Sequence, residues 1–312
     1  MNVANLGPLE IIKLAIFYAG YLYFPAAFFL AFLIARRKMA TKIIAVFALL
    51  ILSTLAYARF IEPRMLLTVE HEAALDRCFP EAGSARLAVF SDTHEGLFKN
   101  AAPIDRIIAR VNAANPDAVF IAGDFVYFLD PARHEETFAA LAAAKAPVFA
   151  VLGNHDVGLP GPDVGAPLGE ALSRLGVVML DDAITTATMN GAEIEIVGLS
   201  ELWAKNQNRA LLEARGDRPR LVLTHNPSTI LELKPREAVD LLLAGHTHGG
   251  QINIPVLNCI LLKPMCRVSL YGFSQEERGL VFVTSGTGMV GLPMRFNRAP
   301  RIDVINLSWR AC

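Results

Sequence analysis

Five short stretches of the sequence place carboxylates, imidazoles and amides directly after an apolar run. The stretches are 91–94, 123–124, 153–156, 224–226 and 245–249. The chain has 7 His, of which only His71 and His134 lie outside these stretches. Carboxylates and imidazoles together favour zinc, iron or manganese over magnesium, which prefers an all-oxygen shell. The combination indicates a site for divalent transition metals.

The spacing inside two of the stretches supports a shared centre. In Asp92-x-His94 and in His246-x-His248 the two side chains are two positions apart. Side chains with this spacing fall on the same side of an extended segment, so both can reach one centre. A single Asp-x-His or Gly-Asp is usually only loop or turn chemistry. The case for a metal site therefore depends on all five stretches occurring together.

The apolar runs before these stretches predict strands at residues 86–90, 118–122 and 148–152, with helices at 104–114 and 137–144 between them. This alternation implies parallel strands with crossover helices. Later strands are expected at 193–199, 220–224, 239–244, 280–284 and 302–307. Ligands bind at the carboxyl ends of strands in open α/β sheets, so the five stretches can converge on one site.

At this point the series Asp92-x-His94, Gly123-Asp124, Gly153-Asn154-His155, His225 and Gly245-His246-x-His248 resembles the calcineurin-like metallophosphoesterase superfamily. The resemblance covers residues from about 86 to 307. The stretch 245–251 and the tail 291–296 resemble its bacterial membrane-associated subgroup. The resemblance implies a four-layer α/β/β/α sandwich of two mixed sheets. It also implies hydrolysis of a phosphodiester, phosphomonoester or pyrophosphate.

The resemblance further implies a role for each matching residue. It gives seven metal ligands: Asp92, His94 and His248 for a first metal, Asn154, His225 and His246 for a second, and Asp124 bridging both. His155 would be catalytic, lying near the leaving-group oxygen without ligating. The cofactors would be two divalent transition metals, manganese, iron or zinc. Such a pair clamps the attacking and leaving oxygens of an in-line displacement.

The N-terminal part of the chain is much more apolar than the rest. Residues 14–35 and 43–58 carry no charge, and the whole chain is 53% hydrophobic with a mean hydropathy of +0.39. A bilayer-spanning helix needs about 20 apolar residues. We therefore expect a two-helix transmembrane anchor at 1–62, a linker at 63–85 and the catalytic domain at 86–312. A buried hairpin in a soluble protein would need a very large core.

The connection between the two apolar runs is rich in positive charge. It holds Arg36, Arg37, Lys38 and Lys42, whereas the outer flanks carry Lys13, Arg59 and Arg64. Positive charge accumulates on the cytoplasmic side of membrane proteins. The connection is thus expected in the cytoplasm, and the catalytic domain of this two-helix membrane protein outside it.

Charge and cysteine content exclude other classes. Lys+Arg number 29 against 30 Asp+Glu, for a net charge of -1, so no nucleic-acid partner is expected. The four cysteines form no CxxC pair, which disfavours a zinc-thiolate site. Cys259 and Cys266 are close enough to bridge a short loop. Free thiols are the expected state, because a disulfide needs an oxidising compartment.

Three hypotheses for function follow. The first is a membrane-anchored phosphoesterase acting on a phosphorylated substrate, with a lipid-linked or cell-envelope compound as the candidate. The second is a UDP-diacylglucosamine pyrophosphohydrolase of lipid A synthesis, whose cytoplasmic substrate disagrees with the expected orientation. The third is a non-catalytic membrane scaffold or sensor that retains the fold, against which the complete ligand set counts.

Overall fold

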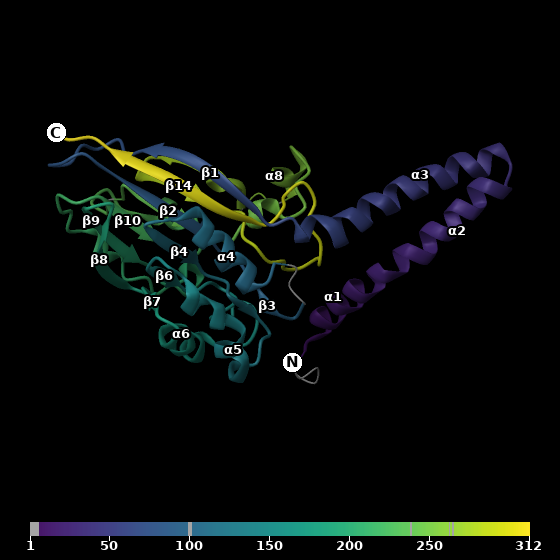
Figure 1. The fold of residues 1–312 in the computed structure, drawn as a ribbon, viewed down its shortest axis with the longest axis horizontal. Coiled ribbons are helices and arrows are strands. Elements are labelled where there is room, and N and C mark those ends of the chain that lie inside the picture. The colour runs from purple at the N-terminus through teal and green to yellow at the C-terminus, as the bar shows by residue number, and fades with distance from the viewer. Residues whose placement is uncertain (1–5, 99–101, 238, 262, 264) are drawn as a thin grey trace.

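A computed structural model describes residues 6–98, 102–237, 239–261, 263 and 265–312. It consists of a long helical hairpin and an α/β domain, and the hairpin projects from one end of the domain (Figure 1). The C-terminus lies at the opposite end of the domain.

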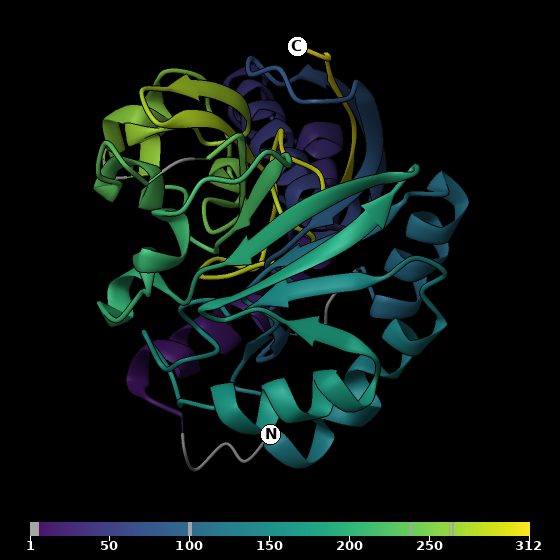
Figure 2. The same cartoon turned by 90° about the vertical axis from the view of Figure 1, so that its left-hand side faces the viewer.

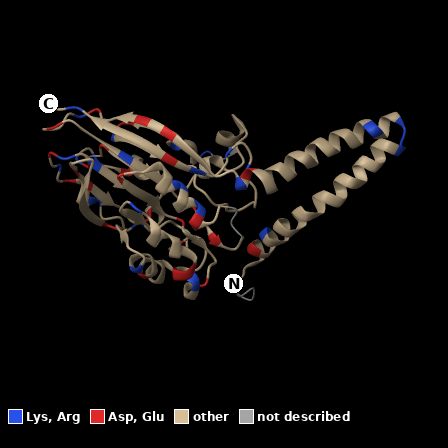
Figure 3. Cartoon of the chain, viewed as in Figure 1, with Lys and Arg blue, Asp and Glu red and all other residues tan. Residues whose placement is uncertain are grey.

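The hairpin contains two long helical stretches, Pro8–Arg36 and Met39–Arg64. The first consists of α1 (Pro8–Ala19), a 3-10 turn (Gly20–Leu22) and α2 (Tyr23–Arg36). The second is α3 (Met39–Ala56), continued by a π turn and a 3-10 turn to Arg64. Both are long and apolar enough to cross a bilayer, and most of their side chains are exposed in the structure. Charged residues gather at the tip and the base of the hairpin (Figure 3).

The first six-stranded sheet has the order β1-β14-β2-β4-β6-β7. Its strands are β1 (Leu67–Ala74), β14 (Arg301–Trp309), β2 (Gly83–Phe90), β4 (Ala118–Ala122), β6 (Val148–Val151) and β7 (Val177–Met179). The strands β2, β4, β6 and β7 are parallel, and β14 pairs antiparallel with β2. The apolar runs of β4 and β6 are buried on both faces, as parallel strands covered on both sides must be.

The second six-stranded sheet has the order β12-β13-β11-β10-β9-β8. Its strands are β12 (Gly272–Glu276), β13 (Gly279–Val283), β11 (Leu241–Ala244), β10 (Arg220–Leu223), β9 (Ala192–Gly198) and β8 (Ala183–Met189). The four central strands β13, β11, β10 and β9 are parallel, and the two edge strands are antiparallel to their neighbours. A two-stranded ribbon joins β3 (Glu95–Gly96) to β5 (Val126–Tyr127).

Three apolar cores show how the layers pack. The central core lies between the sheets and includes Leu87 and Phe120 of the first sheet and Leu221 and Leu243 of the second. A second core joins the first sheet to α4 (Ile104–Ala114), α5 (His134–Phe138) and α6 (Gly165–Arg174). Figure 2 shows these blue-to-teal helices on one side of the strands. The third core covers the outer face of the second sheet, where the short α7 (Thr229–Glu232) packs.

Two segments have a secondary structure that differs from the sequence-based expectations. The expected linker 63–85 contains β1, which pairs with β14 along its whole length, so the sheet begins well before residue 86. The helix expected at 137–144 is instead α5, which ends at Phe138, followed by the 3-10 segment Ala139–Ala143. Both segments take their form from tertiary contacts: β1 from backbone pairing with a distant strand, and the alanine-rich stretch from packing of Phe138 and Leu141 into the core.

The expectation of free thiols is wrong, because all four cysteines are paired. Cys259 bonds to Cys266 within a short loop, and Cys78 bonds to Cys312 across 234 residues of sequence. The second bridge fastens the C-terminal end of β14 to the segment after β1. Phe79 reinforces it, since its carbonyl accepts a hydrogen bond from the Cys312 N–H at 2.8 Å.

The Cys78–Cys312 bridge should contribute to stability because it closes a very long loop. We expect the double substitution Cys78→Ser, Cys312→Ser to lower the free energy of unfolding by about 2–5 kcal/mol. Thermal unfolding of the detergent-solubilised protein measures the loss. Mass spectrometry after alkylation should find no free thiol in the unreduced wild type. Labelling of Cys78 or Cys312 without reductant would contradict the bridge.

Candidate metal centre

The candidate metal site lies at the end of the domain that faces the hairpin. In Figure 1, β14 runs away from the hairpin, and β2 is antiparallel to it, so the carboxyl ends of β2, β4 and β6 face the hairpin. The loops after these three strands carry Asp92, Asp124 and Asn154. The loops after β10 and β11 bring His225 and His246 to the same place.

The first potential metal-binding group consists of Asp92, His94 and His248. All three residues are buried, and their ligand atoms lie within 4.8 Å of one another. Nε2 of His94 is 2.9 Å from Nε2 of His248, and Asp92 Oδ1 is 3.3 Å from the latter. Among the residues that the structure describes, no hydrogen-bond partner reaches Asp92 Oδ1. Asp92 and His94 thus lie in the same group, but His248 is separated from His246, which belongs to the second group.

The second group consists of Asp124, His225 and His246, with the Asn154 amide beside them. Asn154 Oδ1 lies 3.0 Å from His225 Nε2 and 2.9 Å from His246 Nδ1. The His225 Nδ1–H donates to the Ala122 carbonyl at 2.7 Å, which fixes the ring and leaves Nε2 directed into the group. Histidine ligands of metals are generally oriented in this way, by donating the other ring N–H to a carboxylate, a backbone carbonyl or water.

Asp124 lies between the two groups. Its Oδ2 atom is 3.5 Å from His94 Nε2 and 3.2 Å from His225 Nε2. Two neighbouring glycines make room for it: a Cβ on Gly153 would lie 2.2 Å from Asp124 Oδ1, and one on Gly123 would lie 2.6 Å from the Gly153 nitrogen. One carboxylate therefore faces nitrogen atoms of both groups, which is the position that a shared ligand requires.

His155 lies at the rim of the site, next to both a potential ligand group and the hairpin. Its backbone N–H donates to Asp124 Oδ1 at 2.9 Å, and its Nδ1–H donates to the Pro160 carbonyl at 2.9 Å. Its ring also falls within a group with His94 and Asp124. Tyr127 packs edge-on against both rings, with centroids 4.6 Å from His155 and 6.3 Å from His94.

Asp156 belongs to the site, although the sequence motifs indicated no role for it. It is fully buried, and its carboxylate accepts hydrogen bonds from the backbone N–H groups of Gly153, Phe125 and Val126. It therefore ties the loop after β4 to the loop after β6. Its position directly after Gly153-Asn154-His155 was the sequence feature that could have indicated a role in the site. Burial, followed by the charge of Asp124, raises the pKa of Asp156 to about 8.

The backbone of the site is unusual. Five of the candidate ligands have a left-handed backbone, with φ of 53° at Asp92, 45° at His94, 55° at Asp124, 70° at His246 and 52° at His248. Non-glycine residues adopt this region uncommonly, and such residues cluster at functional sites. The turns that follow these strands thus direct the side chains inward rather than along the strand.

Burial sets the protonation of most imidazoles. It lowers the pKa of His94 and His248 well below the usual value, and that of His246 to about 3. Burial would also lower the pKa of His225, but Asp124 raises it well above the usual value. Conversely, burial would raise the pKa of Asp124, yet His225 holds it well below its usual range. Neutral imidazole is the form that ligates metals, so three of these rings are ready to bind.

Arg295 is a buried cation behind the first group. Its Nη2 atom lies 3.5 Å from His248 Nδ1, and its side chain donates to the carbonyls of Gly288, Ser285 and Arg298. Burial lowers the pKa of Arg295 to about 9. Its backbone N–H donates to the Ala58 carbonyl near the end of the second long helix, at 2.9 Å. The sequence singled out the tail 291–296 by its resemblance to the membrane-associated subgroup, but it did not indicate that Arg295 contacts both His248 and the hairpin.

A cavity of about 900 Å³ opens beside the second group. Trp203 forms one wall and packs edge-on against the His246 ring at 4.6 Å. The lining is mixed, with Leu202 and Met265 beside the cations of Lys205, Arg209 and Arg267. It can therefore hold a group that combines apolar parts with negative charge.

The donor set fits a pair of transition-metal ions. Both groups mix carboxylate oxygen with imidazole nitrogen, are withdrawn from solvent, and share one carboxylate. The buried Asp92 Oδ1 atom would otherwise face imidazole nitrogens without a donor in the described part of the chain. The structure thus brings together all seven residues expected as ligands, with His155 beside them.

Comparison with known proteins identifies the class. The family model for calcineurin-like phosphoesterases matches residues 85–250, more than half of the chain. The chain belongs to this family, and it has the buried His/Asp cluster of a metal-dependent phosphoesterase.

Three relatives show how far the similarity extends. The uncharacterized metallophosphoesterase YkuE of Bacillus subtilis is 30% identical over 80% of this chain and 88% of its own length. The phosphodiesterase YaeI of Escherichia coli is 28% identical over 88% of this chain and 100% of its own. A transmembrane protein with a metallophosphoesterase domain from Danio rerio is 27% identical over 88% of this chain and 66% of its own.

The position of Asp124 predicts that both metals depend on it. We expect Asp124→Asn to lose metal from both groups, because an amide supplies less charge to each ion than the shared carboxylate. His246→Ala should lose metal from the second group alone. Elemental analysis of the purified proteins measures the metal per chain, with about two per chain expected in the wild type. A full metal complement in Asp124→Asn would remove the shared-ligand arrangement.

Proposed function

We propose that this protein is a membrane-anchored phosphodiesterase that uses two divalent transition metals, manganese, iron or zinc. The observation that carries the proposal is the Asp124 carboxylate between two groups of buried ligands. In the proposed assignment Asp92, His94 and His248 hold one metal, Asn154, His225 and His246 hold the other, and Asp124 touches both. The similarity to the phosphodiesterase YaeI over most of the chain supports a diester as the substrate.

When bound, the metal pair would activate water and stabilise negative charge on the phosphoryl group. The residues of the chain supply the geometry for this. The carbonyl of Ala122 fixes the His225 ring, and Asp156 holds the loops of Asp124 and Asn154 in register. Because these contacts are internal, the ligands are oriented before any substrate arrives.

We assign His155 to the leaving group. Its Nδ1–H is bound to the Pro160 carbonyl, so Nε2 is the atom free to face the substrate. Nε2 carries a proton only when the ring is the imidazolium. Burial lowers the pKa of His155, although the Asp124 charge and the hydrogen bond to the Pro160 carbonyl favour the imidazolium. His155 can donate to the departing oxygen only as the imidazolium, so in this assignment the negative charge of a bound phosphodiester adds to that of Asp124 and raises its pKa.

The membrane part of the proposal has two supports. The helices Pro8–Arg36 and Met39–Arg64 have the length and composition of bilayer spans, and a transmembrane relative shares the domain. The two disulfides favour an oxidising compartment, and therefore a catalytic domain outside the cytoplasm. The same disulfides count against a UDP-diacylglucosamine pyrophosphohydrolase, whose substrate is cytoplasmic.

Replacing His155 should separate chemistry from metal binding. We expect His155→Ala to keep its metals and fold but to lower kcat on an alkyl phosphodiester by about 10²–10⁴, the range for a positioned acid-base group. The loss should be smaller on bis(p-nitrophenyl) phosphate, because nitrophenolate departs with less help. Steady-state kinetics on both diesters, with metal analysis, give the measurement.

The matched control for this experiment is His246→Ala, which should lose metal and be impaired equally on both diesters. Equal impairment of His155→Ala on good and poor leaving groups would remove the leaving-group role. Loss of metal from His155→Ala would make His155 a ligand, consistent with its position near His94 and Asp124.

The hairpin predicts a specific topology. A reporter fused after Cys312 should be active outside the cytoplasm, and one inserted near Met39 should report the cytoplasm. The reason is the positive charge at the hairpin tip (Figure 3), where Arg36 ends α2 and Arg37 and Lys38 connect it to α3. A C-terminal reporter active only in the cytoplasm would reverse the orientation and bring back the pyrophosphohydrolase hypothesis.

A further inference from the structure

Residues 254–260, called here the apolar loop, expose a cluster of large aliphatic side chains. The exposed fractions are 44% for Ile254, 81% for Val256, 40% for Leu257 and 62% for Ile260. Within residues 68–312, no other described stretch of seven residues exposes four large aliphatic side chains. Exposed large aliphatic side chains gathered in this way mark a surface that something else covers.

The apolar loop lies beside the end of the hairpin that joins the domain. A hollow of about 390 Å³ is lined by Tyr57 and Glu62 of the second long helix and by Ile254 and Pro255 of the loop. Figure 1 places α8 (Leu257–Leu261), which forms most of the loop, next to the domain end of α3. If the hairpin crosses a bilayer, the apolar loop is therefore level with the surface of that bilayer.

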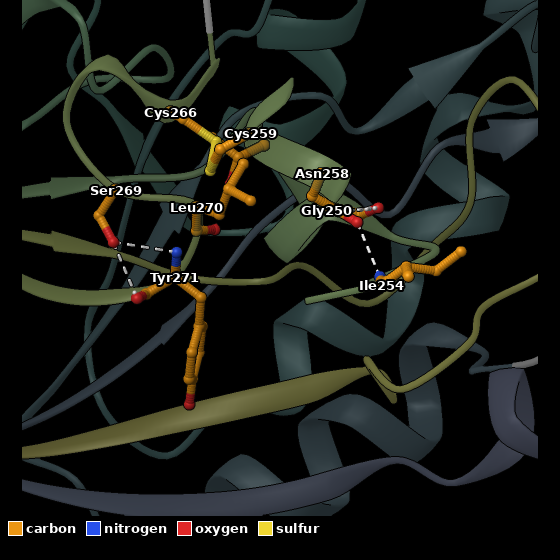
Figure 4. The surroundings of a disulfide bond; sticks show 9 residues. Gly250, Ile254, Asn258, Cys259, Cys266, Ser269, Leu270 and Tyr271 are labelled. Carbon is orange, nitrogen blue, oxygen red and sulfur yellow. Dashed lines mark hydrogen bonds between the residues drawn. A yellow bond between two sulfur atoms is a disulfide. The ribbon is translucent and has the colours of Figure 1, made fainter. Parts of the chain in front are cut away.

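The loop is held with its apolar side chains outward. The Ile254 N–H donates to Asn258 Oδ1 at 2.7 Å, and the buried Asn258 side chain donates to the Gly250 carbonyl at 3.3 Å (Figure 4). The Cys259–Cys266 bond closes the loop on its other side (Figure 4). These contacts fasten the loop to Gly250, two residues after the ligand His248.

The far end of the same disulfide-closed segment reaches the cavity beside His246. Met265 and Arg267 line that cavity together with Trp203. The apolar loop thus lies toward the expected bilayer surface, and the residues that follow it reach the cavity beside His246. The cations Lys205, Arg209 and Arg267 outnumber the acidic lining residue Glu232, which suits a phosphate-bearing head group.

We propose that the apolar loop docks on the bilayer and that the site hydrolyses a phosphodiester lipid while that lipid stays in the membrane, its head group entering the cavity beside His246. This inference rests on the proposed phosphodiesterase function. In the reaction, water adds to phosphorus, the bond from phosphorus to the head-group oxygen breaks, and that oxygen leaves with a proton. The lipid chains need not leave the bilayer, because the site faces it.

Two substrates with the same leaving group test the proposal. The full-length protein is reconstituted in phosphatidylcholine vesicles and given either soluble bis(p-nitrophenyl) phosphate or the p-nitrophenyl ester of dioleoyl phosphatidic acid within the same vesicles. We expect both to release nitrophenolate. If neither is cleaved, the proposed function fails. If only the soluble diester is cleaved, the phosphodiesterase function stands and the lipid inference is overturned.

A loop variant provides the second arm. Val256→Asp with Ile260→Asp should lower the rate on the vesicle lipid about tenfold or more and leave the rate on the soluble diester within about twofold, because aspartate resists entry into the lipid interface. Both positions are exposed, and Asp tolerates the left-handed backbone of Val256, φ 68°, better than a β-branched residue. Folding should therefore be unaffected.

The matched control is Ile184→Asp on β8, an aliphatic residue with 46% of its surface exposed, which should change neither rate. An unchanged lipid rate in the loop variant would overturn bilayer docking and leave a protein partner as the occupant of the loop. An equal loss on both substrates would also overturn it, since the loop would then act on the metal site itself.

Discussion

The close approach of Asp124 to imidazoles from both sheets is the contact on which the rest of the molecule depends. His94 follows a strand of the first sheet and His225 a strand of the second, and both have Nε2 within 3.5 Å of the same carboxylate oxygen. Gathering so many ionisable groups away from water is unfavourable unless each is paired or ligated. The central apolar core packs the two sheets face to face. The carboxyl ends of their strands therefore meet, and this makes the gathering possible.

The hairpin is connected to the metal centre from two directions. On one side, Lys13 and Glu10 of α1 hydrogen-bond to the Tyr127 hydroxyl at 2.8 and 2.9 Å, and the Tyr127 ring lies against His94 and His155. On the other, the Ala58 carbonyl accepts from the backbone of Arg295, whose side chain lies beside His248. Phe17 adds a stacked contact with Phe98. The hairpin is thus part of the support of the site.

The sequence indicated the residues that the structure brings together, because the signals for them are local. Each ligand follows a short apolar run that forms a strand. The carboxyl ends of parallel strands lie at the same edge of a sheet, so the ligands come together there. The β1 strand escaped prediction because its sequence mixes His71 and acidic residues with apolar ones, and five of its eight residues are exposed. Its place is fixed by pairing with β14, more than 200 residues later.

The remaining features could not be read from one chain for a similar reason. The Cys78–Cys312 bond depends on that same β1–β14 pairing, which brings two distant segments together. Tyr127 and Arg295 act through contacts with the hairpin that no spacing rule encodes. The apolar loop carries no motif, and its meaning comes only from its position beside the end of α3. Local chemistry was therefore predictable, and long-range pairing was not.

The left-handed backbone at five ligands has a consequence for which side chains these positions admit. Asp and His are among the few non-glycine residues that enter this region with some ease, and β-branched residues are the least suited to it. Backbone conformation and coordination chemistry thus select the same residue types. A substitution chosen only to remove a ligand atom, such as His to Val, would also burden the turn, whereas Gly would isolate the loss of the ligand.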